Sequence, residues 1–470
     1  MNFKTKKILA VIVLTISLGN FAKADLTAKI NSIISESSQK KVQYSIDIVK
    51  ADPGRTVYSY NANTPMVPAS NMKIIVSAAA LKFLGPNFQY KTRIGLCGDT
   101  LAVIASGDPL LGDEKTDTKY GREAGWVFED IAAKLKQNSI TAIKDIVVDS
   151  SIFDDQRIHP NWPTAQLNQW YACEVSGLNY NGNCVDMVVE NNGGIISLSI
   201  KPKTDFISIT NKVAPISKGS GAVGAYRQAT KPNNLIIKGK CRKKQGPFAV
   251  AIERPAAFFG FLLAENLASE QIDVKGRLLE KAVGTDCDFK ILAEYTTSIS
   301  DCLSRCNKDS FGLAAEAIFK SISANINPDK KNGSWENSRA IISTYLLGIG
   351  IETDQFYIDD GRGLSRQNKL SANAITKVLL DVYKSRDWSL YKNSLAAGGI
   401  DGTTAKYFKE EKYKGKIFGK TGYIDGVKSF SGVCSTAEGD YIFSILTNKA
   451  NGKTRKAIND IAKAIVDSGQ

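Results

Sequence analysis

Apolar and polar positions alternate near the start of the chain and then change to a helical pattern. Residues 41–64, KVQYSIDIVKADPGRTVYSYNANT, read as two strands joined by a Pro-Gly turn. The pattern then becomes helical from Ser70 to about Leu84 and stops at Gly85. This helix is apolar on nearly every face, so we expect it to be buried.

The middle and the end of the chain differ in their pattern of apolar and polar residues. Between about residues 92 and 285, strand-like runs such as IISLSIKP, DFISITN and NNLIIKG alternate with turns rich in Gly, Asn and Pro. Helical patterns return after about residue 288, and the strands GKIFGKTGYI, VKSFSGVCS and DYIFSILTN precede a closing helix over about 453–468. We expect that helix to pack on the sheet. Strand-and-helix material at both ends therefore predicts one discontinuous domain that holds a β-rich insertion.

The first 24 residues predict a cleaved targeting signal. Three lysines precede the apolar stretch ILAVIVLTISLG, which is shorter than the ~20 residues of a membrane span. FAKA then offers a cleavage site after Ala24. We expect a protein that is periplasmic or otherwise exported, with at most peripheral membrane contact.

The charge is strongly positive. The net charge is +14, and the four lysines of the signal leave about +10 on the mature chain. Along the sequence the lysines read as scattered rather than clustered. Export argues against a nucleic-acid partner, and a basic surface suits an anionic polymer of the cell envelope equally well.

Histidine and cysteine usage narrows the chemistry. The single histidine, His159, lies among prolines in QRIHPNWP and is expected to be structural. The chain has no multi-histidine or Cys-x-x-C pattern, so we expect no metal and no other cofactor. Export permits disulfides, but the pairing of eight cysteines is left open; Cys173 with Cys184 and Cys302 with Cys306 are the closest in sequence.

Two short motifs are candidates for catalysis without histidine. Ser70 precedes Lys73 by three positions, which places both on one face at the start of a helix, where unpaired N–H groups favour negative charge. The same spacing occurs at Ser37 and Ser38, so it is not specific by itself. Lys420-Thr421-Gly422 on a late strand is equally weak when taken alone.

Together with their surroundings these motifs resemble a known family. A Ser-x-x-Lys at a helix start and a Lys-Thr-Gly on a late strand belong to the motif set of penicillin-recognising serine enzymes. The matching stretches occur in order through most of the mature chain: VPASNMKIIVSAAALKFLGP, ASGDPLL, DSSIFDDQRIHPNWP, NKDSFGLAAEAIFK, DDGRGLSRQNKLSA, AAGGIDGTTAKYF and GKTGYIDGVKSFSGV. The chain is similar to low-molecular-mass class C penicillin-binding proteins, the D-alanyl-D-alanine carboxypeptidases of peptidase family S13.

The resemblance implies an acyl-enzyme mechanism on peptidoglycan peptide stems, with β-lactam antibiotics as covalent inhibitors. Ser70 is the implied nucleophile and Lys73 its base, with Lys420 as the cation that lowers the pKa of Lys73. Ser310 is implied to relay a proton to the leaving D-alanine. The backbone N–H groups of Ser70 and Tyr423 are implied to form the oxyanion hole.

The same resemblance implies the substrate contacts. Lys420 and Thr421 would hold the terminal carboxylate, while Gly422 allows close approach to the strand. Arg366, with Asp154 or Asp155, is a candidate for the charged side chain of the third peptide residue. Solvated surface charge is an equally good interpretation of these three residues.

Three positions depart from the family pattern. Gly312 stands where the Ser-x-Asn motif has its asparagine, and loss of that polar contact is worth ~1–3 kcal/mol. Arg362 replaces a usual serine, and Tyr423 replaces a smaller residue. Two alternatives to the carboxypeptidase, which is also a candidate D,D-endopeptidase, therefore stay open: a catalytically weakened peptidoglycan-binding homologue, and a β-lactamase.

The resemblance also implies the fold. We expect an α/β (α+β) transpeptidase-like domain over residues 25–91 and 286–470, with a five-stranded antiparallel sheet flanked by helices. Two β-rich domains are expected as insertions, the first over 92–118 and 184–285 and the second over 119–183.

Overall fold

The chain folds as two compact units. The computed structural model describes residues 25–228, 230–326 and 332–469, so the predicted signal lies outside the described residues. Unit 1 comprises Met1–Lys82, Leu303–Phe311 and Arg339–Gln470, and unit 2 comprises Phe83–Cys302 and Gly312–Ser338. Within the described ranges, no helix combines the length and apolar character that a bilayer crossing requires. The predicted three-part division stays a prediction.

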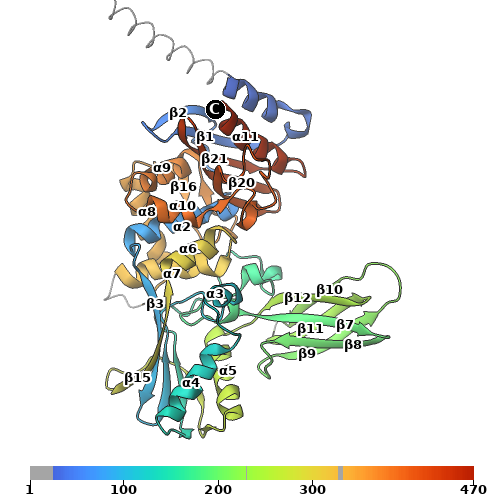
Figure 1. Ribbon diagram of the computed structural model, residues 1–470, viewed down its shortest axis with the longest axis vertical. Helices are drawn as coiled ribbons and strands as arrows, with labels where there is room; N and C mark the ends of the chain where they lie inside the picture. The colour runs from blue at the N-terminus through green and yellow to red at the C-terminus, as the bar shows by residue number, and fades with distance from the viewer. Residues whose placement is uncertain (1–24, 229, 327–331, 470) are drawn as a thin grey trace, which may run out of the picture. The chain divides into compact units, whose positions relative to one another are not determined.

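Unit 1 is built on one antiparallel sheet in the order β18-β19-β20-β21-β1-β2. Its strands are β1 (Gln43–Lys50), β2 (Arg55–Tyr60), β18 (Ala396–Ala397), β19 (Ile417–Ile424), β20 (Val427–Thr436) and β21 (Gly439–Asn448). Strands from the two ends of the chain lie side by side, blue beside red in Figure 1. The expected five strands are present, and the two-residue β18 adds a sixth because its backbone pairs with β19.

Helices cover both faces of this sheet. In β1, Ile46 and Ile48 point into the same apolar core as α11 (Thr454–Ser468). The intervening Ser45 and Asp47 point to the other face, where they hydrogen-bond α9 (Ala372–Tyr383). The two-residue period of the strand thus decides which helix each side chain meets. The other helices and short strands with residues in unit 1 are a helix over 25–35, η1 (Ser37–Gln39), η2 (Ala69–Asn71), α2 (Met72–Phe83), α6 (Ile299–Asn307), α8 (Trp335–Gly348), η6 (Thr353–Gln355), β16 (Phe356–Tyr357), β17 (Lys369–Leu370), α10 (Trp388–Ser394) and η7 (Gly402–Thr404).

Unit 2 contains a mixed five-stranded sheet in the order β14-β6-β4-β3-β15. Its strands are β3 (Gln89–Cys97), β4 (Thr100–Ile104), β6 (Ile146–Asp149), β14 (Leu278–Glu280) and β15 (Phe289–Ser298). Two helices share its apolar core, α4 (Trp126–Gln137) and α5 (Pro255–Ser269). A disulfide joins Cys97 to Cys287, a pairing that the sequence left open. The other elements of unit 2 are α3 (Glu114–Lys119), β5 (Ala142–Ile143), η3 (Thr164–Gln166), η4 (Trp170–Ala172), η5 (Asn181–Asn183), β13 (Asp273–Val274) and α7 (Gly312–Ile326).

Two three-stranded sheets complete unit 2 and form a β-sandwich. One has the order β10-β11-β9 and the other β12-β7-β8. The strands are β7 (Cys184–Asn192), β8 (Ile195–Lys201), β9 (Ser208–Pro215), β10 (Val223–Gln228), β11 (Lys231–Cys241) and β12 (Lys244–Ala251), drawn in green in Figure 1. Met187 and Val189 of one sheet and Leu235 and Ile237 of the other belong to one buried core. The predicted runs at 195–202, 205–211 and 233–239 are thus confirmed as strands, with different ends.

Candidate active site

Ser70 lies in the tight turn η2, directly before α2. The sequence predicted a helix from Ser70 to about Leu84; the regular helix runs from Met72 to Phe83, and Ser70 is in the 3-10 turn that starts it. Asn71 fixes this turn to β19, because its Nδ2 donates to the carbonyl of Lys420 at 2.6 Å. Its Oδ1 accepts from Ser431 Oγ at 2.7 Å, and Asn71 is fully buried.

The predicted serine–lysine pair is in contact. Lys73 Nζ donates to Ser70 Oγ at 3.2 Å and to the carbonyl oxygen of Arg362 at 2.6 Å. The side chain is 2% exposed, as expected for a lysine that a buried helix carries toward a reactive group. The Arg362 carbonyl therefore gives the ammonium an acceptor beside the serine hydroxyl.

The loop that presents this carbonyl is held by a buried carboxylate. Asp360 accepts hydrogen bonds from the backbone N–H groups of Gly363, Leu364 and Ser365 at 2.7, 3.1 and 2.8 Å. Gly363 has a φ of 81°, and a Cβ there would lie 1.9 Å from the carbonyl of Ala69. The loop thus passes too close to the serine turn for any residue except glycine.

Lys420 and Ser310 form the second polar pair. Lys420 is fully buried, and its Nζ donates to Ser310 Oγ and to the carbonyl of Thr421, both at 2.8 Å. Ser310 has a φ of 60°, a left-handed conformation that is uncommon for residues other than glycine and clusters at functional sites. Burial, followed by repulsion from the Lys73 ammonium, lowers the pKa of Lys420 well below its usual range. The Lys420 amine therefore gives up its proton more readily than an isolated lysine does.

The strand β19 passes close to the serine backbone at Gly422. A Cβ on Gly422 would lie 2.1 Å from Ser429 Oγ, 2.9 Å from the carbonyl of Pro68 and 3.1 Å from Ser70 N. The next residue, Tyr423, is 69% exposed, so its ring adds bulk on the outside while its backbone continues the strand. The glycine is thus required for the close approach of β19 to Ser70 N.

Thr421 has a partner that sequence reasoning did not single out. Its Oγ1 lies 2.9 Å from Thr403 Oγ1, a residue of η7. The backbone N–H of Thr403 donates to the carbonyl of Lys308 at 2.9 Å, and Lys308 Nζ pairs with Asp401 at 2.6 Å. The segment AAGGIDGTTAKYF carried the resemblance, but nothing in its spacing identifies Thr403 as a neighbour of β19.

Arg455 is a second such residue. This arginine of α11 donates to the carbonyls of Ser429 at 3.1 Å and Gly422 at 2.9 Å, and burial lowers its pKa. It therefore fixes the two strands on which the close approach at Gly422 depends. A helix-face arginine gives no such signal in the sequence.

The residues predicted to bind the third peptide residue differ in their exposure and in the partners they already have. Arg366 is exposed, and one of its guanidinium nitrogens donates to the carbonyl of Asp425 at 2.6 Å. In unit 2, Asp154 is bound by the fully buried ammonium of Lys320 at 2.5 Å, whereas Asp155 is exposed. Lys320 also lies 4.0 Å from the centre of the Trp335 ring. The carboxylate of Asp154 is thus already neutralised within its own unit.

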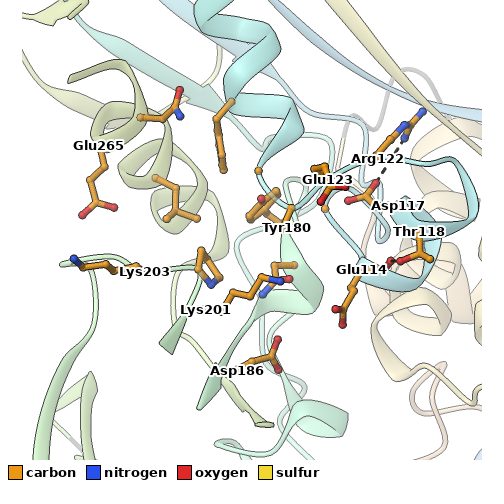
Figure 2. Close-up of a pocket in the computed structure, with 18 of the residues that line it drawn as sticks. Glu114, Asp117, Thr118, Arg122, Glu123, Tyr180, Asp186, Lys201, Lys203 and Glu265 are labelled. Atoms are coloured by element: carbon orange, nitrogen blue, oxygen red, sulfur yellow. Dashed lines mark hydrogen bonds and ion pairs between the residues drawn. The ribbon is translucent and has the colours of Figure 1, made fainter. Parts of the chain in front are cut away.

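Unit 2 contains a separate cavity of ≈ 460 Å³. Figure 2 shows its carboxylates and lysines, with Asp117 facing Arg122 at 3.8 Å. Burial raises the pKa of Asp117 to about 6. The residues predicted for acyl transfer are not among those that line this cavity, so we do not assign the reaction to it.

The fold and the site of unit 1 define a class. A serine hydroxyl beside a buried amine, on an antiparallel sheet covered by helices, is the arrangement of serine hydrolases with the penicillin-binding-protein fold. Comparison with known proteins agrees. The family model described as "D-Ala-D-Ala carboxypeptidase 3 (S13) family" matches residues 26–467.

Relatives and solved structures point the same way. A D-alanyl-D-alanine carboxypeptidase of Actinomadura sp. is 25% identical over 469 residues, which cover 93% of this chain and 83% of that protein. The crystal structure of penicillin binding protein 4 (dacB) from Haemophilus influenzae matches with a TM-score of 0.78 and 20% identity, covering 93% of this chain and 98% of that one. A predatory peptidoglycan endopeptidase of Bdellovibrio bacteriovorus has a TM-score of 0.51 and 14% identity, covering 91% and 94%.

The chain belongs to the S13 family of D-Ala-D-Ala carboxypeptidases. The predicted family, fold class and enzyme class are thereby confirmed.

Proposed function

We propose that this carboxypeptidase removes the terminal D-alanine of peptidoglycan stem peptides through an acyl-enzyme on Ser70. The observation that carries this assignment is the 3.2 Å contact from Lys73 Nζ to Ser70 Oγ in a buried site. The chain has one histidine, His159, which is 2% exposed and packs edge-on against Trp335, so the proton transfers at Ser70 fall to lysine. With its predicted signal removed, the enzyme acts on the exported side of the membrane.

Acylation starts when neutral Lys73 takes the proton of Ser70. The oxygen attacks the carbonyl carbon of the penultimate D-alanine, and the resulting oxyanion is held by the N–H groups of Ser70 and Tyr423. The close approach of β19 at Gly422 supports this hole. The C–N bond then breaks, and the leaving D-alanine takes a proton through Ser310, which hydrogen-bonds Lys420. Water hydrolyses the ester and restores Ser70.

The substrate carboxylate binds to Lys420 and Thr421. A bound carboxylate stabilises the protonated form of the buried Lys420 amine, which then supplies charge. The Thr421 hydroxyl, which donates to Thr403 Oγ1 in the free protein, turns to the same carboxylate and accepts from Thr403 instead. Arg366 retains further guanidinium donors for an acidic group on the third peptide residue, beside the one that donates to the Asp425 carbonyl. β-Lactams, whose ring carbonyl replaces the scissile peptide, acylate the same serine.

Gly312 begins α7 and has no side-chain amide to offer. The carbonyl of Arg362 partly compensates, because it accepts a hydrogen bond from the Lys73 ammonium. We therefore favour a slower enzyme over an inactive binding homologue.

The test combines two assays on the mature chain. Fluorescent penicillin labelling reports acylation, and D-alanine release from a pentapeptide reports turnover. Ser70→Ala should abolish both, while Ser37→Ala, a serine with the same spacing to a lysine, should change neither. Labelling without D-alanine release would indicate a penicillin-recognising binding homologue, and rapid hydrolysis of penicillin without peptide cleavage would indicate a β-lactamase. Including a cross-linked dimeric stem peptide tests the D,D-endopeptidase reading.

A further inference from the structure

The positive charge of the mature chain is concentrated in one place. Residues 201–244 carry nine lysines and two arginines against one acid, Asp205, which gives them a net charge of +10. This equals the whole excess of the mature chain. The expectation of scattered lysines therefore misses where the net charge lies: the nine lysines within 201–244 are spaced along the sequence, but all nine belong to the β-sandwich and its connections.

The strand register brings these lysines together. On the outer face of the β10-β11-β9 sheet, Lys212 and Lys238 are direct partners on neighbouring parallel strands. Both are exposed, and the residue opposite Lys238 on β10 is Gly224. Like charges directly opposite each other destabilise a sheet unless an anion lies between them or over them.

The turns at one end of the sandwich add more cations. The ends of β9 and β11 meet at Pro215 and Cys241, which places the loops that carry Lys218 and Arg242 at the same end. The β7–β8 turn joins them, because the N–H of Asn191 donates to the carbonyl of Lys243 at 2.6 Å. We call this surface the basic tip; its cations are Lys218, Lys240, Arg242, Lys243 and Lys244. Among the described residues, Lys244 is the one of the five with an ion pair, to Glu190 at 2.9 Å.

Apolar side chains lie at this same charged end. Ile195, which follows two glycines in the β7–β8 turn, is 75% exposed. Tyr226 is 52% exposed on the outer face of β10, and Lys238 Nζ lies 5.1 Å from the centre of its ring. A soluble polyanion needs cations alone, whereas an interfacial site combines cations with apolar and aromatic side chains that enter the headgroup region.

We propose that the basic tip docks unit 2 on an anionic phospholipid surface. The lysines and arginine lie against the lipid phosphates, and Ile195 enters the boundary between headgroups and acyl chains. Each Lys or Arg near such a surface strengthens binding about fivefold, so five cations give reversible attachment without a spanning segment. The attachment increases the time that the enzyme spends near the membrane and involves no residue of the catalytic site.

The test measures binding of the mature chain, from Asp25, to vesicles by co-sedimentation. Vesicles of phosphatidylcholine with about one-third phosphatidylglycerol should bind it at least about tenfold more tightly than pure phosphatidylcholine. Reversal of three tip charges, in Lys240→Glu/Arg242→Glu/Lys243→Glu, should weaken that binding by about a hundredfold or more. The matched control is Lys384→Glu/Lys409→Glu/Lys414→Glu, which changes the net charge equally at exposed positions of unit 1 and should bind as the parent does.

Ile195→Ser separates a membrane from a soluble polymer. It leaves the charge unchanged and should weaken vesicle binding about tenfold, through the loss of buried apolar surface. Inorganic polyphosphate serves as the soluble probe. If Ile195→Ser binds vesicles as tightly as the parent while polyphosphate removes both from the vesicles, the ligand is a soluble polyanion and the membrane proposal is overturned. Equal binding by the tip and control triple variants would also overturn it.

Folding of the variants is checked independently of binding. The melting temperature and penicillin labelling should match those of the parent, because the four substituted positions, Lys240, Arg242, Lys243 and Ile195, are exposed and lie outside unit 1. If the charge-reversed variant unfolds, Lys240→Gln/Arg242→Gln/Lys243→Gln replaces it, with about a tenfold loss of binding or more expected.

Discussion

Gly422→Ala tests the oxyanion hole through a single methyl group. The added Cβ would lie 2.9 Å from the carbonyl of Pro68 and 3.1 Å from Ser70 N, both backbone atoms held in the serine turn. Ordinary contacts of a Cβ begin near 3.4 Å, so β19 and the turn must move apart by a few tenths of an ångström. That movement separates the two N–H groups that should converge on one oxygen.

The expected magnitude follows from the loss of one aligned donor. Removing a single oxyanion-hole donor slows acyl transfer by about 10²–10³-fold, or about 2.7–4 kcal/mol. The extra methyl also costs about 1–3 kcal/mol of folding free energy through overpacking. We expect the second-order rate of penicillin acylation to fall by about a hundredfold or more, with a lower melting temperature and intact folding.

A second variant, in which one of the steric contacts is removed, separates displacement of the backbone N–H groups from a general loss of stability. The nearest atom to the new Cβ is Ser429 Oγ, at 2.1 Å, which donates to the Pro68 carbonyl at 2.8 Å. Ser429→Ala combined with Gly422→Ala should recover part of the stability and little of the rate, because the backbone contacts remain. Gly452→Ala is the matched control, since its Cβ would meet nothing within 4 Å. Acylation by Gly422→Ala at the parental rate would refute the proposed oxyanion hole.

Three further predictions concern the two buried lysines, Gly312 and Arg455. The acylation rate should rise with pH, with a midpoint below the ~10.4 of free lysine, because burial and then repulsion from Lys73 lower the pKa of Lys420. A midpoint at or above ~10.4 would contradict this electrostatic argument. Gly312→Asn should raise D-alanine release by about tenfold if the missing amide costs ~1–3 kcal/mol, and an unchanged rate would mean that the Arg362 carbonyl fully replaces it. Arg455→Ala should lower the free energy of unfolding by about 2–4 kcal/mol, because two buried carbonyls lose charged donors. It should also slow acylation more than it weakens peptide binding. A lower melting temperature with a normal acylation rate would show that Arg455 does not position β19.

The sequence predicted the residues that react better than the residues that hold them in place. The Ser70–Lys73 contact follows from helical spacing, and Lys420 was found through its motif. Thr403 and Arg455 reach the site through an irregular turn and through the face of a distant helix, and neither arrangement follows a period.

The fold shows the same division. Alternation identified β1 and β2 and the three strands near the end of the chain, because apolar and polar side chains alternate along them even where helices bury both faces, as Ile46 and Asp47 of β1 show. The helix α5 was missed: its sequence PAAFFGFLLAENLAS is apolar on most faces, so it carries little amphipathic signal inside a segment that reads as strands. The lysine cluster was missed because Lys212 and Lys238 are made neighbours by parallel pairing, which spacing along the chain does not show.

The pairing of β1 with β21 has a consequence for how the enzyme is made. Gln43 is the register partner of Asn448, so the sheet joins segments about 400 residues apart. A ribosome adds about 5–20 residues per second, so the nucleophile exists for on the order of a minute at most before Lys420 and the last strands follow it. Unit 2 is nearly continuous in sequence and can mature during that interval. The newly synthesised chain therefore cannot cleave peptidoglycan until its last strands have been made and have completed the sheet.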